Sequence, residues 1–325
     1  MTAELIIHIG ANKTASSSIQ RFIQANQKPL TDLGYIIPDR DVGTSNEVTG
    51  EQVFGLQSFL QSKGQPAKRL KTRMEKIFDS RSNKSQKILL SAENMGTTRG
   101  AKLFSEVCAT RKTKVVFYIR RQDDLIASSW QQWHSKTETD YGAFLLKSLR
   151  TLGNWENVIN AWEKIVGKDN IRLGVFERNK FHNGDIIQDF IHKIGAHAHM
   201  DTFDIPEVNS NPSFFEYITP LVAGNKAIFQ SIHDNDFYRV VEKLTGQTYS
   251  KGKKYSMMTR LQRDNIMKFF EGQNERIREK YFPDEKTLFA PINHSKYRYI
   301  TEEQAADLQI KFLTHMVYEI GRRTV

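Results

Sequence analysis

LIIHIGANKTASSSIQ, residues 5–20, decides the fold class of this chain. The apolar run of residues 5–9 predicts a buried strand, which Gly10 ends. A short loop with Lys13 and several hydroxyl side chains follows, and then Ile19 and Phe22 begin an apolar pattern at helical spacing. Backbone N–H groups at a helix N-terminus, hydroxyl groups and a lysine all bind anionic oxygens. The order strand, small-residue loop, helix therefore predicts a cradle for a phosphate-like group.

The spacing around Lys13 argues against a loop that wraps a nucleoside triphosphate. A Walker A loop follows GxxxxGK[ST], with a glycine directly before the lysine. Here Asn12 precedes Lys13, and Gly10 lies only three residues upstream. The simplest alternative to a cradle is an ordinary helix N-terminus capped by serines.

The loop resembles instead the 5′-phosphosulfate loop of sulfotransferases that use 3′-phosphoadenosine 5′-phosphosulfate (PAPS), typically HIGxxKTGTTSLQ. The residues that match this pattern as they stand are His8, Ile9, Gly10, Lys13, Thr14, Ser18 and Gln20. Ala15 replaces the usual glycine, which permits backbone conformations that alanine disfavours, and Ser16 and Ser17 replace threonines but keep their hydroxyl groups. The resemblance implies PAPS as cofactor, with adenosine 3′,5′-bisphosphate (PAP) as product. It implies that the cofactor is bound by Gly10, Asn12, Lys13, Thr14, Ala15, Ser16 and Ser17.

A second segment, KVVFYIRRQDDLIASSWQQW at residues 114–133, strengthens this interpretation. Its β-rich run predicts a strand that ends at Arg120, followed by a helix. PAPS-dependent sulfotransferases have an arginine at such a strand end and a serine eight residues later, and both hold the 3′-phosphate. Arg120 and Ser128 have that spacing, and a guanidinium binds a phosphate bidentately. Arg121 with Ser129 has the same spacing and stays open as the alternative.

Strands alternating with helices predict a parallel sheet with right-handed crossovers. The expected strands are residues 5–9, 35–37, 88–91, 115–119 and 171–176. The expected helices are residues 17–26, 67–78, 124–134, 155–165 and 184–194. We expect an α/β fold with a P-loop-like parallel sheet flanked by helices and a helical C-terminal part. The expected domains are a PAPS-binding core over residues 1–200 and a mostly helical extension over residues 201–325 that packs on the core and shapes the acceptor site. In the extension, residues 266–281 predict one amphipathic helix, and Thr301 with Gln304 predicts a capping box for the last helix, whose apolar stripe we expect to be buried.

Composition limits the compartment and the partners. The net charge is +10, yet no nucleic-acid-binding pattern accompanies it, and basic clusters at residues 68–76 and 251–254 are typical of solvated faces. With an anionic cofactor, a positive field would also aid capture. No membrane span or signal peptide is expected, and peripheral membrane contact stays open. The single cysteine, Cys108, fits a reducing compartment, so we expect a cytoplasmic protein.

Transfer to an alcohol needs a general base. Glu93, in the sequence SAEN directly after an apolar run, is the leading candidate, because glycan-modifying sulfotransferases often have a glutamate there. A shielded carboxylate would have a raised pKa, which suits this role. His134 is the second candidate, whereas His8 is expected to be a buried, hydrogen-bonded residue. No metal-ligand spacing occurs among the histidines and the cysteine.

The sequence therefore predicts a sulfotransferase, similar to prokaryotic and glycan-modifying ones, that moves a sulfuryl group from PAPS to a hydroxyl of a sugar or glycan. Lys13 would stabilise the leaving phosphate and Glu93 would act as base. Another hydroxyl-bearing acceptor remains open, as does the oligomeric state. Residues 251–254 and Tyr255 are weaker candidates for cofactor contacts. The alternatives are a magnesium- and ATP-dependent small-molecule kinase and a non-catalytic nucleotide-binding protein.

Overall fold

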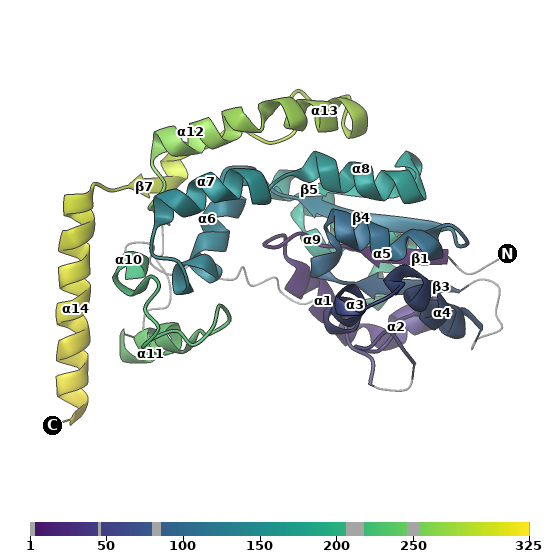
Figure 1. The fold of residues 1–325 in the computed structure, drawn as a ribbon, viewed down its shortest axis with the longest axis horizontal. Coiled ribbons are helices and arrows are strands. Elements are labelled where there is room, and N and C mark those ends of the chain that lie inside the picture. Colours follow the sequence, from purple (N-terminus) through teal and green to yellow (C-terminus); the bar gives the residue numbers. More distant parts are fainter. Residues whose placement is uncertain (1–3, 45–46, 80–85, 206–217, 246–253, 325) are drawn as a thin grey trace. The chain divides into compact units, whose positions relative to one another are not determined.

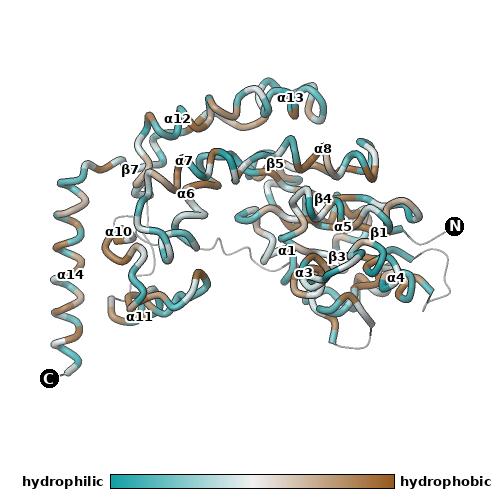
Figure 2. The backbone as a smooth tube through the Cα atoms, viewed as in Figure 1, coloured by the Kyte–Doolittle hydropathy of each residue, from teal (hydrophilic) through white to brown (hydrophobic). Residues whose placement is uncertain are grey.

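The computed structural model describes residues 4–44, 47–79, 86–205, 218–245 and 254–324 (Figure 1). Hydrophobic and hydrophilic residues alternate along several of its helices (Figure 2). None of the helices in these ranges is long and apolar enough to cross a membrane.

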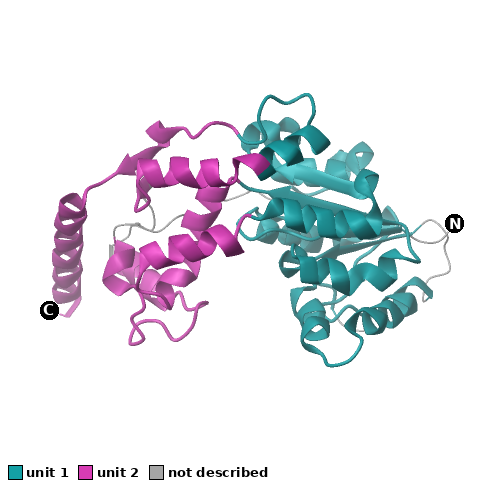
Figure 3. Ribbon diagram, turned by 45° about the horizontal axis from the view of Figure 1, so that its top comes forward, with its two compact units in different colours: residues 1–120, 154–208, 273–289 teal, residues 121–153, 209–272, 290–325 magenta. Residues whose placement is uncertain are grey.

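The chain forms two compact units (Figure 3), which are interleaved along the sequence, whereas the predicted domains are consecutive. The first unit comprises residues 1–120, 154–208 and 273–289. The second comprises residues 121–153, 209–272 and 290–325.

The first unit is built on a five-stranded sheet in the order β2-β3-β1-β4-β5. The strands are β1 (Glu4–His8), β2 (Tyr35–Ile36), β3 (Lys87–Ser91), β4 (Thr113–Ile119) and β5 (Ile171–Val175). All neighbouring strands are parallel, so their carboxyl ends meet at one edge, with β1 in the centre. The predicted α/β fold class is confirmed, and so are the five predicted strands.

Helices cover both faces of this sheet, because residues alternate between the faces along each strand. On one face, Ile6, Val116 and Tyr118 pack against side chains of α1 (Ser16–Ala25) and α9 (Ile186–Ile194). On the other face, α8 (Trp155–Val166) contacts β4, and its Trp155 meets Phe117 edge to face. Each such buried apolar side chain contributes about 1.5–3 kcal/mol.

Further helices complete the first unit. They are α2 (Gln27–Asp32), α3 (Val53–Gln61), α4 (Pro66–Asp79), α5 (Thr98–Cys108) and most of α13 (Glu271–Tyr281). The helix α5 contacts both α4 and α8. Residues of α13 return to the first unit through ion pairs with α8, Arg276 to Glu156 and Lys280 to Glu163, both at 2.7 Å.

The second unit is mainly helical. It contains α6 (Gln122–Gln132), α7 (Tyr141–Thr151), α10 (Thr219–Val222), α11 (Asp236–Thr245), α12 (Arg260–Phe269), α14 (Glu302–Thr324) and the short strands β6 (Lys254–Ser256) and β7 (Tyr297–Tyr299). Ile126, Trp130, Phe144 and Phe270 form its apolar core. The helical C-terminal part is therefore confirmed. The single helix predicted over residues 266–281 is wrong, because α12 ends at Phe269 and α13 begins at Glu271.

The last helix differs from its prediction on one face. The predicted capping box is present, with Thr301 N donating to Gln304 Oε1 at 3.1 Å and Gln304 N donating to Thr301 Oγ1 at 3.2 Å. However, Val317 is 70% exposed and Leu313 and Ile320 are each 49% exposed. The expected burial of these residues is wrong: α14 contacts α11, but much of its apolar stripe stays exposed.

Candidate functional site

The candidate cradle is the loop between β1 and α1, at the carboxyl edge of the central strand. Three of its residues have positive φ: Gly10 at 49°, Lys13 at 67° and Ala15 at 60°. Left-handed residues on both sides of Thr14 turn successive N–H groups toward one side, which is the geometry of an anion-binding nest. The first N–H groups of α1 add to this, because they have no partner within the helix.

Gly10 is required by close packing as well as by its φ angle. A Cβ atom at Gly10 would lie 2.9 Å from Glu93 Cα and 2.9 Å from Ser16 Oγ. A Cβ atom at Gly96 would lie only 2.1 Å from the Gly10 carbonyl oxygen. The loop is therefore pressed against the segment that follows β3, which contains Glu93.

Hydroxyl groups of the loop close it internally. Thr14 Oγ1 donates to the Ala11 carbonyl oxygen at 2.7 Å, and Ser16 Oγ donates to the same oxygen at 3.3 Å. Thr14 and Ser16 are buried, whereas Asn12 and Ser17 are exposed. In this conformation Thr14 and Ser16 thus fix the shape of the loop, and the Asn12 and Ser17 side chains face solvent.

Ala15 is strained, because an L-residue with a side chain costs roughly 1–2 kcal/mol in the left-handed region. It is the N-cap of α1 and makes no side-chain capping bond. Ala15→Gly should therefore raise the free energy of unfolding by about 1 kcal/mol, after the greater chain entropy of glycine is subtracted. Urea denaturation measures this directly. Ala25→Gly, at a helical position of α1, is the control and should be destabilising; a loss of stability with Ala15→Gly would contradict the strain.

Glu93 begins a short 3-10 helix, η1 (Glu93–Met95), directly beyond β3. Burial raises the pKa of its carboxyl group, although the charge of Lys13 and a hydrogen bond with Ser16 act to lower it, and the carboxylate of Glu51 raises it further. Glu93 therefore lies within electrostatic range of Lys13 and holds its proton more tightly than a solvated glutamate. Glu51 was not predicted as a site residue, because only the fold brings it near Glu93.

Arg120 follows β4 and joins the same loop. Its Nη1 donates to the Lys13 carbonyl oxygen at 2.9 Å, and its guanidinium lies 5.8 Å from the centre of the Phe176 ring. The Arg120 carbonyl oxygen accepts a hydrogen bond from Trp155 Nε1 at 2.8 Å. Lys13, Glu93 and Arg120 are thus brought together within the first unit.

The alternative arginine has a different environment. Arg121 Nε donates to Asp123 Oδ1 at 2.6 Å, and Arg121 Nη2 donates to Asp124 Oδ2 at 3.2 Å. Asp123 is also paired with the buried Arg263 at 2.7 Å. This network stabilises the N-terminus of α6 and engages the Arg121 side chain, whereas Arg120 contacts the loop that contains Lys13.

Ser128 and His134 belong to the second unit, so their places beside Arg120 and Glu93 stay predictions. Ser128 Oγ donates to the Asp124 carbonyl oxygen at 2.6 Å, one turn back along α6. His134 lies just beyond α6, with Nδ1 at 3.3 Å from Glu138 Oε1 and its ring centroid 4.7 Å from that of Phe144.

His8 is buried, as predicted, and hydrogen-bonded: its Nδ1 lies 2.8 Å from Ser91 Oγ. Burial lowers its pKa to about 3, so it is neutral at physiological pH.

Gln52, which was not predicted, ties the chain before α3 to the end of β3, because its Oε1 accepts from Ser91 N at 2.9 Å. Trp155 and Trp130 are 5% and 2% exposed, which makes them core residues.

The basic stretch near the C-terminal part lies mostly outside the described residues, which omit 251–253. Tyr255, in β6, accepts a hydrogen bond from Arg298 Nη1 at 2.9 Å. Among the residues that the structure describes, no group of His, Cys, Asp and Glu side chains is arranged to hold a metal ion.

No protein-family model and no curated protein matches the chain. Among solved structures, it is similar to a sulfotransferase from Alicyclobacillus acidocaldarius, with 14% sequence identity and a TM-score of 0.39. The alignment covers 72% of this chain and 98% of that one. A likeness at this level assigns no activity to the chain.

Proposed function

We propose that this protein is a sulfotransferase that moves a sulfuryl group from PAPS to a hydroxyl group of a sugar or glycan. The proposal rests mainly on one observation: Lys13, Glu93 and Arg120 converge on a strained loop at the carboxyl edge of a parallel sheet. Ligands of such sheets bind at this edge. The loop sequence, which resembles a 5′-phosphosulfate loop, gives the ligand class.

The charges and N–H groups of the cradle support a doubly phosphorylated adenosine as its ligand. Backbone N–H groups of residues 13–17 and the Lys13 ammonium group would hold the 5′-phosphate end of the donor. Arg120 and Ser128 would hold the 3′-phosphate. PAPS supplies the activated sulfuryl group, and the chain supplies position and charge.

Two residues would act on the reaction itself. Glu93 would accept the proton of the attacking hydroxyl group, and its raised pKa improves it as a base. Lys13 would stabilise the negative charge that develops on the leaving phosphate oxygen. His134 remains the alternative base.

Calorimetric titration with PAP and with ATP, each with and without magnesium, tests this proposal. We expect PAP to bind without metal and to raise the melting temperature, because the loop lacks the Walker A spacing that wraps a nucleoside triphosphate. A clear preference for magnesium-ATP would favour the kinase and overturn the proposal. PAP binding without sulfuryl transfer to any sugar would favour a non-catalytic nucleotide-binding protein.

A further inference from the structure

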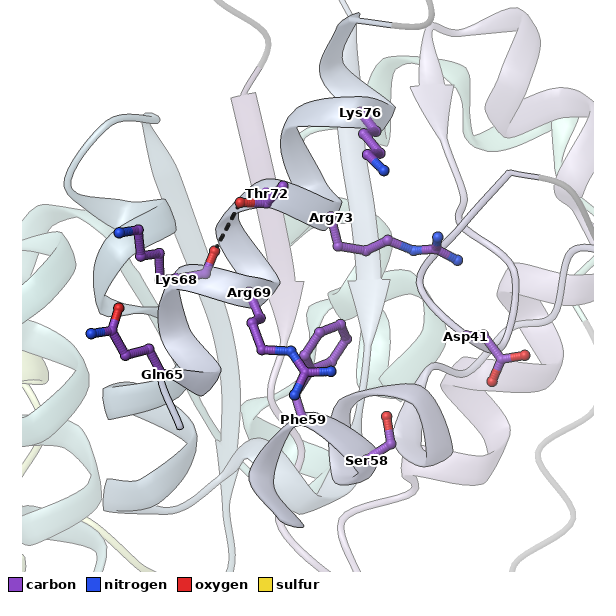
Figure 4. Close-up of a pocket in the computed structure, with 9 residues that line it drawn as sticks. All are labelled: Asp41, Ser58, Phe59, Gln65, Lys68, Arg69, Thr72, Arg73 and Lys76. Carbon is purple, nitrogen blue, oxygen red and sulfur yellow. Dashed lines mark hydrogen bonds between the residues drawn. The ribbon is translucent and has the colours of Figure 1, made fainter. Parts of the chain in front are cut away.

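A second cationic site lies in the first unit, formed by α3, α4 and the chain around Asp41. A pocket of about 670 Å³ opens there (Figure 4). Four cationic side chains line it, Lys68, Arg69, Arg73 and Lys76, all from α4. The sequence marks these residues only as a basic run; the pocket exists because α3 forms its other wall.

The cations occupy one face of an amphipathic helix. The opposite face of α4 is buried in the core through Leu70, Met74, Ile77 and Phe78. Residues 68, 69, 72, 73 and 76 recur at helical spacing, so they share the outer face. The basic residues of this face are therefore gathered on a single surface above the pocket.

This surface has few compensating charges. Asp41 is the one carboxylate among the residues that line the pocket. Glu75 of α4 lies on another stripe, where it pairs with Lys71 at 4.0 Å. Within the described ranges, the side chains of Lys68, Arg69 and Lys76 make no ion pair or hydrogen bond.

Such an arrangement is unfavourable without a ligand. Arg69 and Arg73 are four residues apart, and Arg73 and Lys76 are three apart, so like charges repel on one helix face. A solvated face normally mixes both signs. Arg73 has compensating contacts, with the Val42 carbonyl oxygen and beside the Asp39 carboxylate at Gly43. The cations that lack such contacts within the described ranges are Lys68, Arg69 and Lys76. A cluster of like charges without such contacts is typical of a functional surface.

One cation is held in place by the backbone. Arg73 Nε donates to the Val42 carbonyl oxygen at 2.8 Å. A Cβ atom at Gly43 would lie 2.6 Å from Arg73 Nη2, so the small residue makes room for the guanidinium. Arg73 is thus a preformed rim of the pocket and not a freely moving surface side chain.

The neutral residues of the lining indicate the kind of anion. Ser58 and Thr72 donate their hydroxyl protons to the carbonyl oxygens of Gly55 and Lys68, at 2.7 Å and 3.2 Å, so their oxygen atoms remain as acceptors. Gln65 adds an amide group and Phe59 an aromatic side chain (Figure 4). Cations that alternate with hydroxyl and amide groups suit a ligand that has both acidic groups and hydroxyl groups. An aromatic ring can stack on the apolar face of a sugar.

We propose that this pocket binds an acidic oligosaccharide, one with carboxylate or sulfate groups, and thereby selects an acidic acceptor. The acceptor role rests on the sulfotransferase function proposed above, whereas the binding itself does not. The wall of the pocket is tied to the segment that contains Glu93, because Asn94 Nδ2 donates to Gln57 Oε1 of α3 at 2.9 Å. Binding of an acidic glycan would therefore affect the segment that contains the proposed base.

Fluorescence anisotropy with a labelled heparin-derived hexasaccharide tests the pocket, with maltohexaose as the neutral comparison. We expect the sulfated probe to bind and the neutral one not to bind. Lys68→Gln should weaken binding roughly fivefold, and Lys68→Gln/Arg69→Gln more than about tenfold, because each charge contacts the ligand. Lys71→Gln is the matched control: it removes the same charge from the same helix but off the pocket, and should change binding less than about twofold.

The outcomes separate this inference from the proposed function. An equal loss of hexasaccharide affinity with Lys71→Gln would indicate that the probe responds to the overall positive charge of the helix. This result would overturn the proposed binding site. Tighter, Lys68-dependent binding of an RNA dodecamer or of phosphatidylserine vesicles would overturn the assignment to a carbohydrate. If PAP binds the protein and the hexasaccharide does not, the pocket inference alone fails. If the hexasaccharide binds through Lys68 and PAP does not bind, the proposed sulfotransferase alone fails.

Discussion

Lys13→Ala should reduce sulfuryl transfer by roughly 10³-fold and weaken PAP binding by at least about tenfold. The side chain of Lys13 is half-buried in the loop, so its charge acts in a partly desolvated place. Removal of one preorganised donor at a developing negative charge costs about 10²–10³ in turnover. The loss of binding follows from the loss of a charge-assisted contact with a phosphate group. Steady-state kinetics and calorimetry measure the two effects separately.

The control for this variant is Lys112→Ala. Lys112 is an exposed lysine of the first unit that pairs with Glu4 at 3.7 Å, at the opposite end of the sheet from the cradle. Lys112→Ala removes the same charge as Lys13→Ala. Equal losses of transfer and of PAP binding in the two variants would mean that the net charge of the protein, and not the cradle, is responsible. Wild-type turnover of Lys13→Ala would contradict the proposed role. Alanine adopts the left-handed conformation at the same cost as lysine, so the melting temperature should change little.

The frame of the candidate site was predictable from local sequence. The run of residues 5–9 is apolar enough to be a central strand, and the chain then changes from a strand pattern to a helix pattern within a few residues. Parallel strands place their carboxyl ends at one edge, so Lys13, Glu93 and Arg120, which each follow a strand, are expected at that edge. The choice of these three residues came from the loop motif and the family resemblance. The contact between Arg120 and the Lys13 carbonyl oxygen agrees with that expectation.

Other features depend on contacts between distant residues and left no local signal. The buried pair of Arg263 with Asp123 joins residues 140 positions apart, and it distinguishes Arg121 from Arg120 only once the fold is known. The internal use of the Thr14 hydroxyl depends on the left-handed turn at Lys13, a conformation that sequence patterns disfavour for lysine. The basic face of α4 becomes a pocket through Phe59 and Ser58, which come from another helix, and through Asp41.

Glu93→Gln should reduce turnover by about 10²-fold or more while leaving PAP binding nearly unchanged, because the amide cannot accept a proton. The same change should not destabilise the protein at neutral pH. Since the folded-state pKa of Glu93 is raised, its contribution to stability is present below the unfolded-state pKa and is lost as the pH rises through the folded-state pKa. At pH 8 the variant should therefore be at least as stable as the wild type, and its advantage should shrink toward pH 4. Glu106→Gln, at an exposed position of α5, is the control and should affect neither property.

The pH dependence distinguishes a catalytic Glu93 from a structural one. If Glu93 is the base, transfer by the wild type falls as the pH drops through the raised pKa of this residue, because the protonated carboxyl group cannot accept the hydroxyl proton. Glu51→Gln removes a like charge and should lower the pKa of Glu93. The acid limb of the pH profile, where transfer falls with decreasing pH, should therefore move to lower pH. Lys13→Ala should move the limb of its residual activity to higher pH, because the loss of a positive charge raises the same pKa. A limb that stays fixed in both variants, together with full activity of Glu93→Gln and loss of activity in His134→Asn, would assign the base to His134.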